Sequence, residues 1–224
     1  MQKLLLFDID GTLLRTHGAG VRAMLRAACE TLGERCRDAQ INFGGALDPW
    51  IFQQIARHGG YDADHDVHSV FRVRYAQYLP HEIRTGQRAS EATPGVLDLL
   101  ARLRAEEHAR IGMLTGNYAE TGAIKLRHVG IDPSWFSPAI WGDAADTRAG
   151  LVRVAIEQTR VPARDVIVIG DTPRDVQCAH DNGARCLAVA TGGHSMQELR
   201  EAGADRVVAD LVDPTPLYEM LGVS

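Results

Sequence analysis

Short apolar segments and longer amphipathic segments alternate along most of this chain. Short apolar runs are typical of buried strands, and the segments between them have the apolar spacing of helices. Strands that alternate with helices fold into a parallel sheet with helices on its faces. The predicted strands cover residues 4–9, 110–114, 139–141, 166–169, 186–190 and 207–208, and the main predicted helices cover residues 96–107, 121–129, 150–159 and 195–202. We therefore predict an α/β fold with a doubly wound, mostly parallel sheet.

The alternation is interrupted once, between residues 15 and 88. This segment has no convincing strand, and its helical patterns cover residues 20–32, 49–58 and 64–79. We therefore predict that residues 17–87 form an all-helical cap inserted after the first strand, and that residues 1–16 and 88–224 form the core. The expected hinges between the two parts are residues 14–18 and 87–93.

The composition argues against several classes of protein. The chain has 224 residues, a net charge of −5 and no basic block, so no nucleic-acid partner is expected. No apolar run approaches the ~20 residues that span a bilayer, so we expect no membrane partner, and the first predicted strand begins too early for a signal segment. The four cysteines lack C-x-x-C spacing, which predicts reduced thiols and a cytoplasmic location. We expect a monomer or a homodimer.

Two acidic residues follow the first predicted strand, in the stretch Asp8-Ile9-Asp10-Gly11. Residues i and i+2 of a strand point to the same face, so Asp8 and Asp10 are expected to project together. Ligand sites of parallel sheets form at the carboxyl ends of the strands, where two carboxylates repel unless they share a cation or a proton. The alternative is an Asp-Gly turn with incidental acids.

Other strand ends carry polar residues that suit a phosphate and a cation. The stretch Thr115-Gly116-Asn117 offers a hydroxyl and backbone N–H groups at a helix start, which suits a phosphate, although Thr is also a common helix cap. Asp171 and Asp175 lie one helical turn apart, and paired carboxylates suit Mg²⁺. A basic residue, Arg148, precedes them. Each feature alone could be a cap or a surface charge, but their succession at neighbouring strand ends favours one shared site.

Together these motifs resemble the haloacid dehalogenase-like (HAD) superfamily. The matching set is Asp8-x-Asp10-Gly11-Thr12, Thr115-Gly116-Asn117, a basic residue near position 148, and Gly170-Asp171-x-x-x-Asp175. Within the superfamily, the chain is most similar to phosphoglycolate phosphatase-like members with a helical cap, and the likeness covers essentially its whole length.

The resemblance implies a role for each of these residues. Asp8 would be the nucleophile that forms an aspartyl-phosphate, and Asp10 would be the general acid and base. Mg²⁺ would be held by Asp8, the Asp10 carbonyl and Asp171, and Asp175 would either bind the metal directly or contact one of its ligands. The phosphate-binding residues would be Gly11, Thr12, Thr115, Gly116, Asn117 and Arg148. The implied activity is hydrolysis of a small phosphomonoester, with 2-phosphoglycolate as one candidate.

The active-site cation departs from the family pattern. Many members have Lys followed by Pro where this chain has Arg148-Ala149. Lys125 is the rival, but it lies ten residues after Thr115, ~12–15 Å along the following helix by the rise per residue. By this reach argument we favour Arg148 and keep Lys125 as the alternative. Arg differs from Lys in geometry, so the substitution bears on phosphate affinity.

The cap is expected to choose the substrate. Its loop 42–48 contains two glycines, and Asp48 either binds a substrate hydroxyl or serves as the N-cap of the helix at 49–58. Residues 15–88 contain no lysine, which argues against phosphonate cleavage through a Schiff base. Asp10 argues against dehalogenation. The alternatives are a phosphomutase of the β-phosphoglucomutase type and a non-catalytic protein that binds a phosphorylated ligand.

Overall fold

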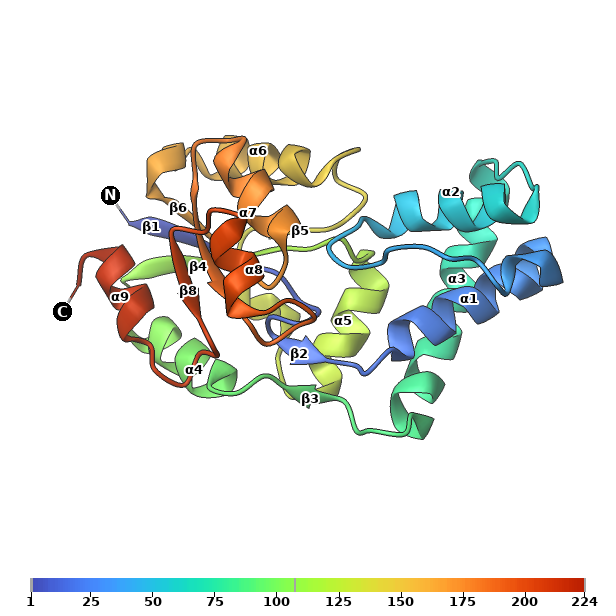
Figure 1. The fold of residues 1–224 in the computed structure, drawn as a ribbon, viewed down its shortest axis with the longest axis horizontal. Coiled ribbons are helices and arrows are strands. Elements are labelled where there is room, and N and C mark those ends of the chain that lie inside the picture. Colours follow the sequence, from blue (N-terminus) through green and yellow to red (C-terminus); the bar gives the residue numbers. More distant parts are fainter. Residues whose placement is uncertain (1, 107, 224) are drawn as a thin grey trace.

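The computed structural model describes residues 2–106 and 108–223, and its centre is a six-stranded sheet (Figure 1). The strand order is β5-β4-β1-β6-β7-β8, and every pairing is parallel. The strands are β1 (Lys3–Phe7), β4 (Ala109–Leu114), β5 (Ala139–Ile140), β6 (Val166–Gly170), β7 (Arg185–Val189) and β8 (Arg206–Val208). The predicted α/β fold with a mostly parallel sheet is confirmed.

The sheet is buried on both faces, as the continuous apolar sequence of β1 requires. Leu5 and Phe7 pack on one face, which is covered by α4 (Val96–Glu106), α5 (Ala119–His128) and α9 (Thr215–Leu221). Leu4 and Leu6 pack on the other face, which is covered by α6 (Arg148–Thr159), α7 (Pro173–His180) and α8 (Met196–Glu201). Alternate side chains of one strand therefore support two separate apolar layers. Residue 107, the predicted end of the helix at 96–107, lies outside the described residues.

The insert between β1 and α4 contains α1 (Ala19–Leu32), η1 (Glu34–Cys36), α2 (Asp48–Gly59) and α3 (His65–Thr85). Its helices enclose their own apolar cluster, which includes Ala23, Phe52, Ile55 and Phe71. The third helix was predicted to cover residues 64–79, but it continues through Pro80 to Thr85. The three predicted helices are present, and the domain boundaries at residues 17 and 87 stay a prediction.

The two chain segments that connect the core to the insert form a small two-stranded antiparallel ribbon. Strand β2 (Leu14–Arg15) pairs antiparallel with β3 (Glu91–Ala92), and the Thr93 N–H donates to the Leu13 carbonyl at 3.0 Å. These segments were expected to be hinges without strands. Two-residue strands are too short to show an alternating pattern, so periodicity could not reveal them.

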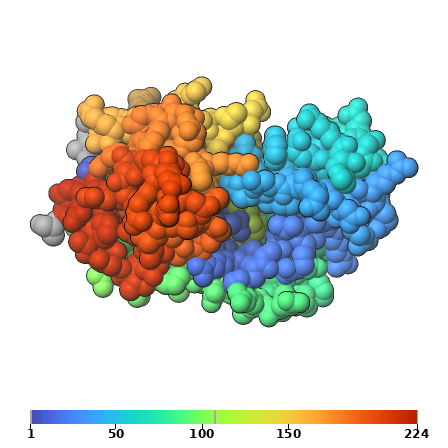
Figure 2. All heavy atoms as spheres, in the orientation of Figure 1, coloured from blue at the N-terminus to red at the C-terminus, as the bar shows by residue number. Residues whose placement is uncertain are grey.

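The insert lies beside the carboxyl ends of the strands (Figure 1). Its loop at residues 40–47 meets the core in the space-filling view (Figure 2). At this contact the Arg174 guanidinium donates a hydrogen bond to the Gly44 carbonyl. Within residues 2–106 and 108–223, no helix is both long and apolar enough to cross a bilayer.

Candidate active site

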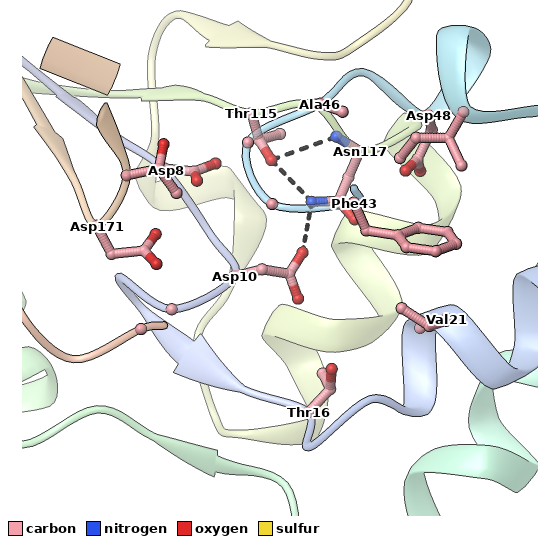
Figure 3. A pocket seen from close by; sticks show the side chains of 18 of the residues that line it. Asp8, Asp10, Thr16, Val21, Phe43, Ala46, Asp48, Thr115, Asn117 and Asp171 are labelled. Atoms are coloured by element: carbon pink, nitrogen blue, oxygen red, sulfur yellow. Dashed lines mark hydrogen bonds between the residues drawn. The ribbon is translucent and has the colours of Figure 1, made fainter. Parts of the chain in front are cut away.

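The predicted site residues meet in a cavity of about 270 Å³ between the sheet edge and the insert (Figure 3). Asp8, Thr115 and Asp171 reach it because they follow β1, β4 and β6, which are adjacent and end at the same edge. Asp10 and Lys125 also line the cavity, as do Gly11, Gly116, Asn117, Arg148 and Asp48. Thr12 and Asp175 are not among the lining residues. Thr12 instead lies with its hydroxyl 3.4 Å from an Asp171 carboxylate oxygen.

Three buried carboxylates, from Asp8, Asp171 and Asp175, form a group that can hold a cation. One oxygen of each lies within 4.8 Å of the others. Burial and the neighbouring carboxylates raise the pKa of Asp171 to about 8. Burial raises the pKa of Asp8 to about 6, although Arg148 acts in the opposite direction. An all-carboxylate donor set suits a hard divalent cation, whose charge would favour the ionised acids.

The loop glycines leave room for this acidic group. A Cβ on Gly11, which has φ +80°, would lie 2.3 Å from Asp171 Oδ2, and one on Gly192 would lie 1.6 Å from the same atom. Any side chain at either position would therefore displace the Asp171 carboxylate. Gly192, which follows β7 in Thr191-Gly192-Gly193, was not among the predicted site residues, and its position just after a predicted strand was the available signal.

Asp175 has most of its hydrogen-bonding capacity occupied within the protein. Its Oδ2 accepts from the Thr172 N–H at 3.0 Å and from the Thr172 hydroxyl at 2.6 Å, which forms a capping box at the start of α7. Its Oδ1 accepts from Arg148 Nε at 2.9 Å. These contacts hold Asp175 against the start of α7 and against Arg148.

Arg148 and Lys125 both lie in the cavity, each beside a different aspartate. Arg148 Nη2 is 3.0 Å from Asp8 Oδ2, whereas Lys125 Nζ is 2.6 Å from Asp10 Oδ2. The expectation that Lys125 lies too far away is wrong. Distance along the helix does not set the position of Lys125, because the side of α5 packs against the loop after β1. A Cβ on Gly122 of α5 would lie 3.2 Å from Ile9 Cδ1 in that loop.

A hydrogen-bonded network fixes the second aspartate (Figure 3). Asn117 Nδ2 donates to Asp10 Oδ2 at 2.9 Å and to Thr115 Oγ1 at 2.8 Å, and Asn117 Oδ1 accepts from Lys125 Nζ at 2.5 Å. The Asn117 side chain thus positions Asp10 and Lys125. The Thr115 hydroxyl accepts from Asn117, which leaves its own proton available for an anion in the cavity.

Asp48 joins the insert to the core. Its backbone N–H donates to the Gly116 carbonyl at 2.8 Å, and its carboxylate Oδ2 accepts from the Tyr118 N–H at 3.0 Å. The N-cap interpretation is wrong, because Leu47 occupies the N-cap of α2 and the Asp48 side chain crosses to the core. Burial raises the pKa of Asp48 to about 7, against the opposing effect of Lys125. The interpretation of Asp48 as a hydroxyl-binding residue stays a prediction.

The sequence matches the family model described as haloacid dehalogenase-like hydrolase over residues 5–189. The chain belongs to this family. Among curated HAD relatives, it is 26% identical to a phosphoglycolate phosphatase of Rhodospirillum rubrum over 239 residues, covering 100% of this chain and 97% of the relative. It is 28% identical to a phosphoglycolate phosphatase of Synechococcus elongatus, covering 90% of each chain.

Solved HAD-like structures share the fold at lower identity. A hydrolase from Pseudomonas syringae superposes with a TM-score of 0.72 at 22% identity, with 100% of both chains covered. CbbY from Rhodobacter sphaeroides, in complex with phosphate, superposes with a TM-score of 0.72 at 21% identity, covering 95% of this chain and 96% of CbbY. These structures support the fold, and the family match over residues 5–189 confirms the HAD resemblance drawn from the motifs.

A divalent cation should stabilise the protein more at about pH 8 than at about pH 5. The raised pKa values of Asp8 and Asp171 mean that the folded protein binds more protons than the unfolded chain from about pH 4 to pH 8. The metal-free protein therefore loses stability as the pH rises through this window, while a cation replaces the protons. Thermal unfolding with and without MgCl₂ measures the difference. Asp171→Asn should remove most of the stabilisation, and an equal gain at both pH values would contradict the assignment.

Replacing Asp48 should separate its hydrogen bond from its charge. Asp48→Ala leaves the buried Tyr118 N–H without an acceptor, and we expect the free energy of unfolding to fall by about 1–3 kcal/mol. Asp48→Asn keeps an acceptor, and it removes a carboxyl whose raised pKa lowers stability as the pH rises from about 4 to about 7. Its stability relative to the native protein should therefore increase with pH. Urea unfolding measures both variants; equal losses at neutral pH would contradict this role of the hydrogen bond.

Proposed function

We propose that this HAD hydrolase is a Mg²⁺-dependent phosphatase that hydrolyses a small phosphomonoester through an aspartyl-phosphate on Asp8. The observation that carries the proposal is the different surroundings of the two aspartates. Asp8 is buried in the acidic group, whereas the Asp10 side chain is 42% exposed and held by Lys125 and Asn117. This difference supports Asp8 as the acid that meets phosphorus and Asp10 as the acid that exchanges a proton.

The reaction would proceed in two steps. An Asp8 oxygen forms a bond to phosphorus while the ester P–O bond breaks, and Asp10 gives its proton to the departing alkoxide. Asp10 then takes a proton from a water molecule, whose oxygen attacks phosphorus and releases Asp8 and inorganic phosphate. Mg²⁺ bound by Asp8 and Asp171, with the Asp10 carbonyl, would offset the negative charge of the phosphoryl group.

The phosphoryl oxygens need further donors during this transfer. The Thr115 hydroxyl, the N–H groups around Gly116 and the Arg148 guanidinium line the same cavity. Arg148 already lies against Asp8, so it would meet the phosphoryl group at the attacking oxygen. We propose Arg148 as the phosphate-binding cation, with Lys125 acting on Asp10.

The names of the relatives support phosphatase activity and make 2-phosphoglycolate the first ester to test. The phosphomutase alternative has a structural neighbour in a protein described as a putative β-phosphoglucomutase from Thermotoga maritima, with a TM-score of 0.65 at 18% identity, which is a likeness of fold. No observation favours it over hydrolysis. A non-catalytic role would leave the acidic arrangement unexplained. The four free thiols support a reducing compartment such as the cytoplasm, and a monomer or homodimer stays the expected state.

Asp8→Asn should abolish hydrolysis of p-nitrophenyl phosphate, because an amide cannot form the aspartyl-phosphate. EDTA should also abolish it, and MgCl₂ should restore it. Release of p-nitrophenol measures both, and the melting temperature of the variant serves as the control for folding. Activity that survives Asp8→Asn would reject the nucleophile, and activity unaffected by EDTA would reject the metal.

Arg148→Ala should lower kcat more than Lys125→Ala. Removing Arg148 takes away the cation beside Asp8 and Asp175, and the loss of such a preorganised charge costs about 10²–10³ in kcat. Arg148→Lys is the matched control that keeps the charge and should recover part of the rate. The reverse order of losses would make Lys125 the phosphate-binding cation.

A further inference from the structure

The cavity has two chemically different ends (Figure 3). Asp8 and Asp171 lie at one end, and Val21 and Phe43 lie at the opposite end, with Asp10 between them. This far wall belongs to the insert. It consists of Val21 and Met24 from α1, Phe43 from the following loop, Ile51 from α2 and Tyr75 from α3. When a phosphoryl group sits at Asp8, the alcohol portion of the ester must face this wall.

The insert contributes no cation to the described residues that line the cavity, and the cation nearest the far wall is Lys125 of the core, whose Nζ would lie 3.3 Å from a Cβ on Gly20. The lining cations are Arg148 and Lys125, both from the core. Arg148 is paired with Asp8 and Asp175, and Lys125 is paired with Asp10 and Asn117. The insert contributes one ionisable carboxyl, Asp48, which already accepts from the Tyr118 N–H.

The arginines of the nearest helices are engaged away from the cavity. Arg22 of α1 binds Glu82 and the His17 carbonyl. Arg72 of α3 forms ion pairs with Glu120 and Asp143, with Nε 2.9 Å from Glu120 Oε1 and Nη1 2.9 Å from Asp143 Oδ2. Neither lines the cavity, so neither is placed to neutralise an anion on the alcohol portion of a substrate.

A second anionic group on the ester would therefore be buried with no cation that is free of other partners among the described lining residues. A carboxylate or a second phosphate at the far wall would face apolar side chains and the Asp10 and Asp48 carboxyls. An unpaired charge in such surroundings loses its hydration with no compensating contact. Apolar carbon, in contrast, gains from burial against Val21, Phe43 and Ile51.

We propose that the substrate is a phosphomonoester of an uncharged alcohol with an apolar carbon framework, and that this selection rests on the apolar wall of the insert. The inference depends on the proposed function and narrows it. Hydroxyls on the alcohol can meet Thr16 and Tyr75, the neutral polar side chains of this part of the cavity. The carboxylate of 2-phosphoglycolate and the second phosphate of a sugar bisphosphate would meet only Lys125, whose ammonium already binds Asp10 and Asn117.

Three esters with the same heavy-atom skeleton test the charge directly: 2-phosphoglycolate, its amide, and isobutyl phosphate. We expect kcat/KM to be at least tenfold higher for isobutyl phosphate and for the amide than for 2-phosphoglycolate. Phosphate release measures all three. Equal or higher kcat/KM for 2-phosphoglycolate would overturn the proposal.

Val21 offers the sharpest substitution, because it is half-buried and faces the cavity from the first turn of α1 (Figure 3). Val21→Arg adds a cation to the wall and should raise kcat/KM for 2-phosphoglycolate relative to isobutyl phosphate at least tenfold. Val21→Met adds length without charge and should leave that ratio within about twofold. If both variants changed the ratio of kcat/KM values equally, the size of the side chain rather than its charge would be responsible, which would contradict the proposal.

A binding measurement keeps this inference separate from the proposed function. Asp8→Asn protein in MgCl₂ should bind isobutyl phosphate at least tenfold more tightly than 2-phosphoglycolate in calorimetric titrations. If p-nitrophenyl phosphate is not hydrolysed by the native protein but this order of affinities holds, the phosphatase assignment fails and the selection of uncharged alcohols stands. Tighter binding of 2-phosphoglycolate would overturn the selection, whatever the turnover.

Discussion

The contact of Arg148 with Asp8 and Asp175 is the interaction on which the site depends. Three carboxylates are buried within a few ångströms, where mutual repulsion is poorly screened. The guanidinium, itself buried, offsets part of this charge before any metal binds. The same group donates to the Gly45 carbonyl at 3.3 Å, so it also ties the loop of the insert to the core. The Arg148 side chain thus both offsets the charge of the carboxylates and holds the insert loop against the cavity.

The residues at strand ends were predictable from sequence because backbone geometry alone brings them together. Asp8, Thr115 and Asp171 follow three adjacent parallel strands, and any such sheet places its carboxyl ends along one edge. The apolar runs that identify the strands are equally plain, since burial on both faces removes polar residues from them. No knowledge of side-chain packing was needed for these predictions.

The positions of Lys125 and Asp48 were not predictable by the same means. Distance along a helix says nothing about what lies beside it, and α5 happens to run past the loop that carries Asp10. Asp48 begins a helix, where a local cap is the ordinary expectation, yet its partner is the Tyr118 N–H, 70 positions away in the sequence. Both depend on contacts between segments distant in sequence, which periodicity does not encode.

Residues at the strand ends are therefore specified by the motifs, whereas the residues that would select the alcohol of the substrate depend on contacts between distant segments. The proposed reacting groups lie at the sheet edge, where the fold fixes them, and the sequence identifies them by their spacing. The far wall is assembled from single side chains of α1, α2, α3 and one loop, and any of them can change without disturbing a motif. At 26–28% identity, a relative can therefore share the reacting groups and differ in the wall. In the proposal made above, the apolar character of that wall, rather than the motif set, determines which phosphate ester the enzyme accepts.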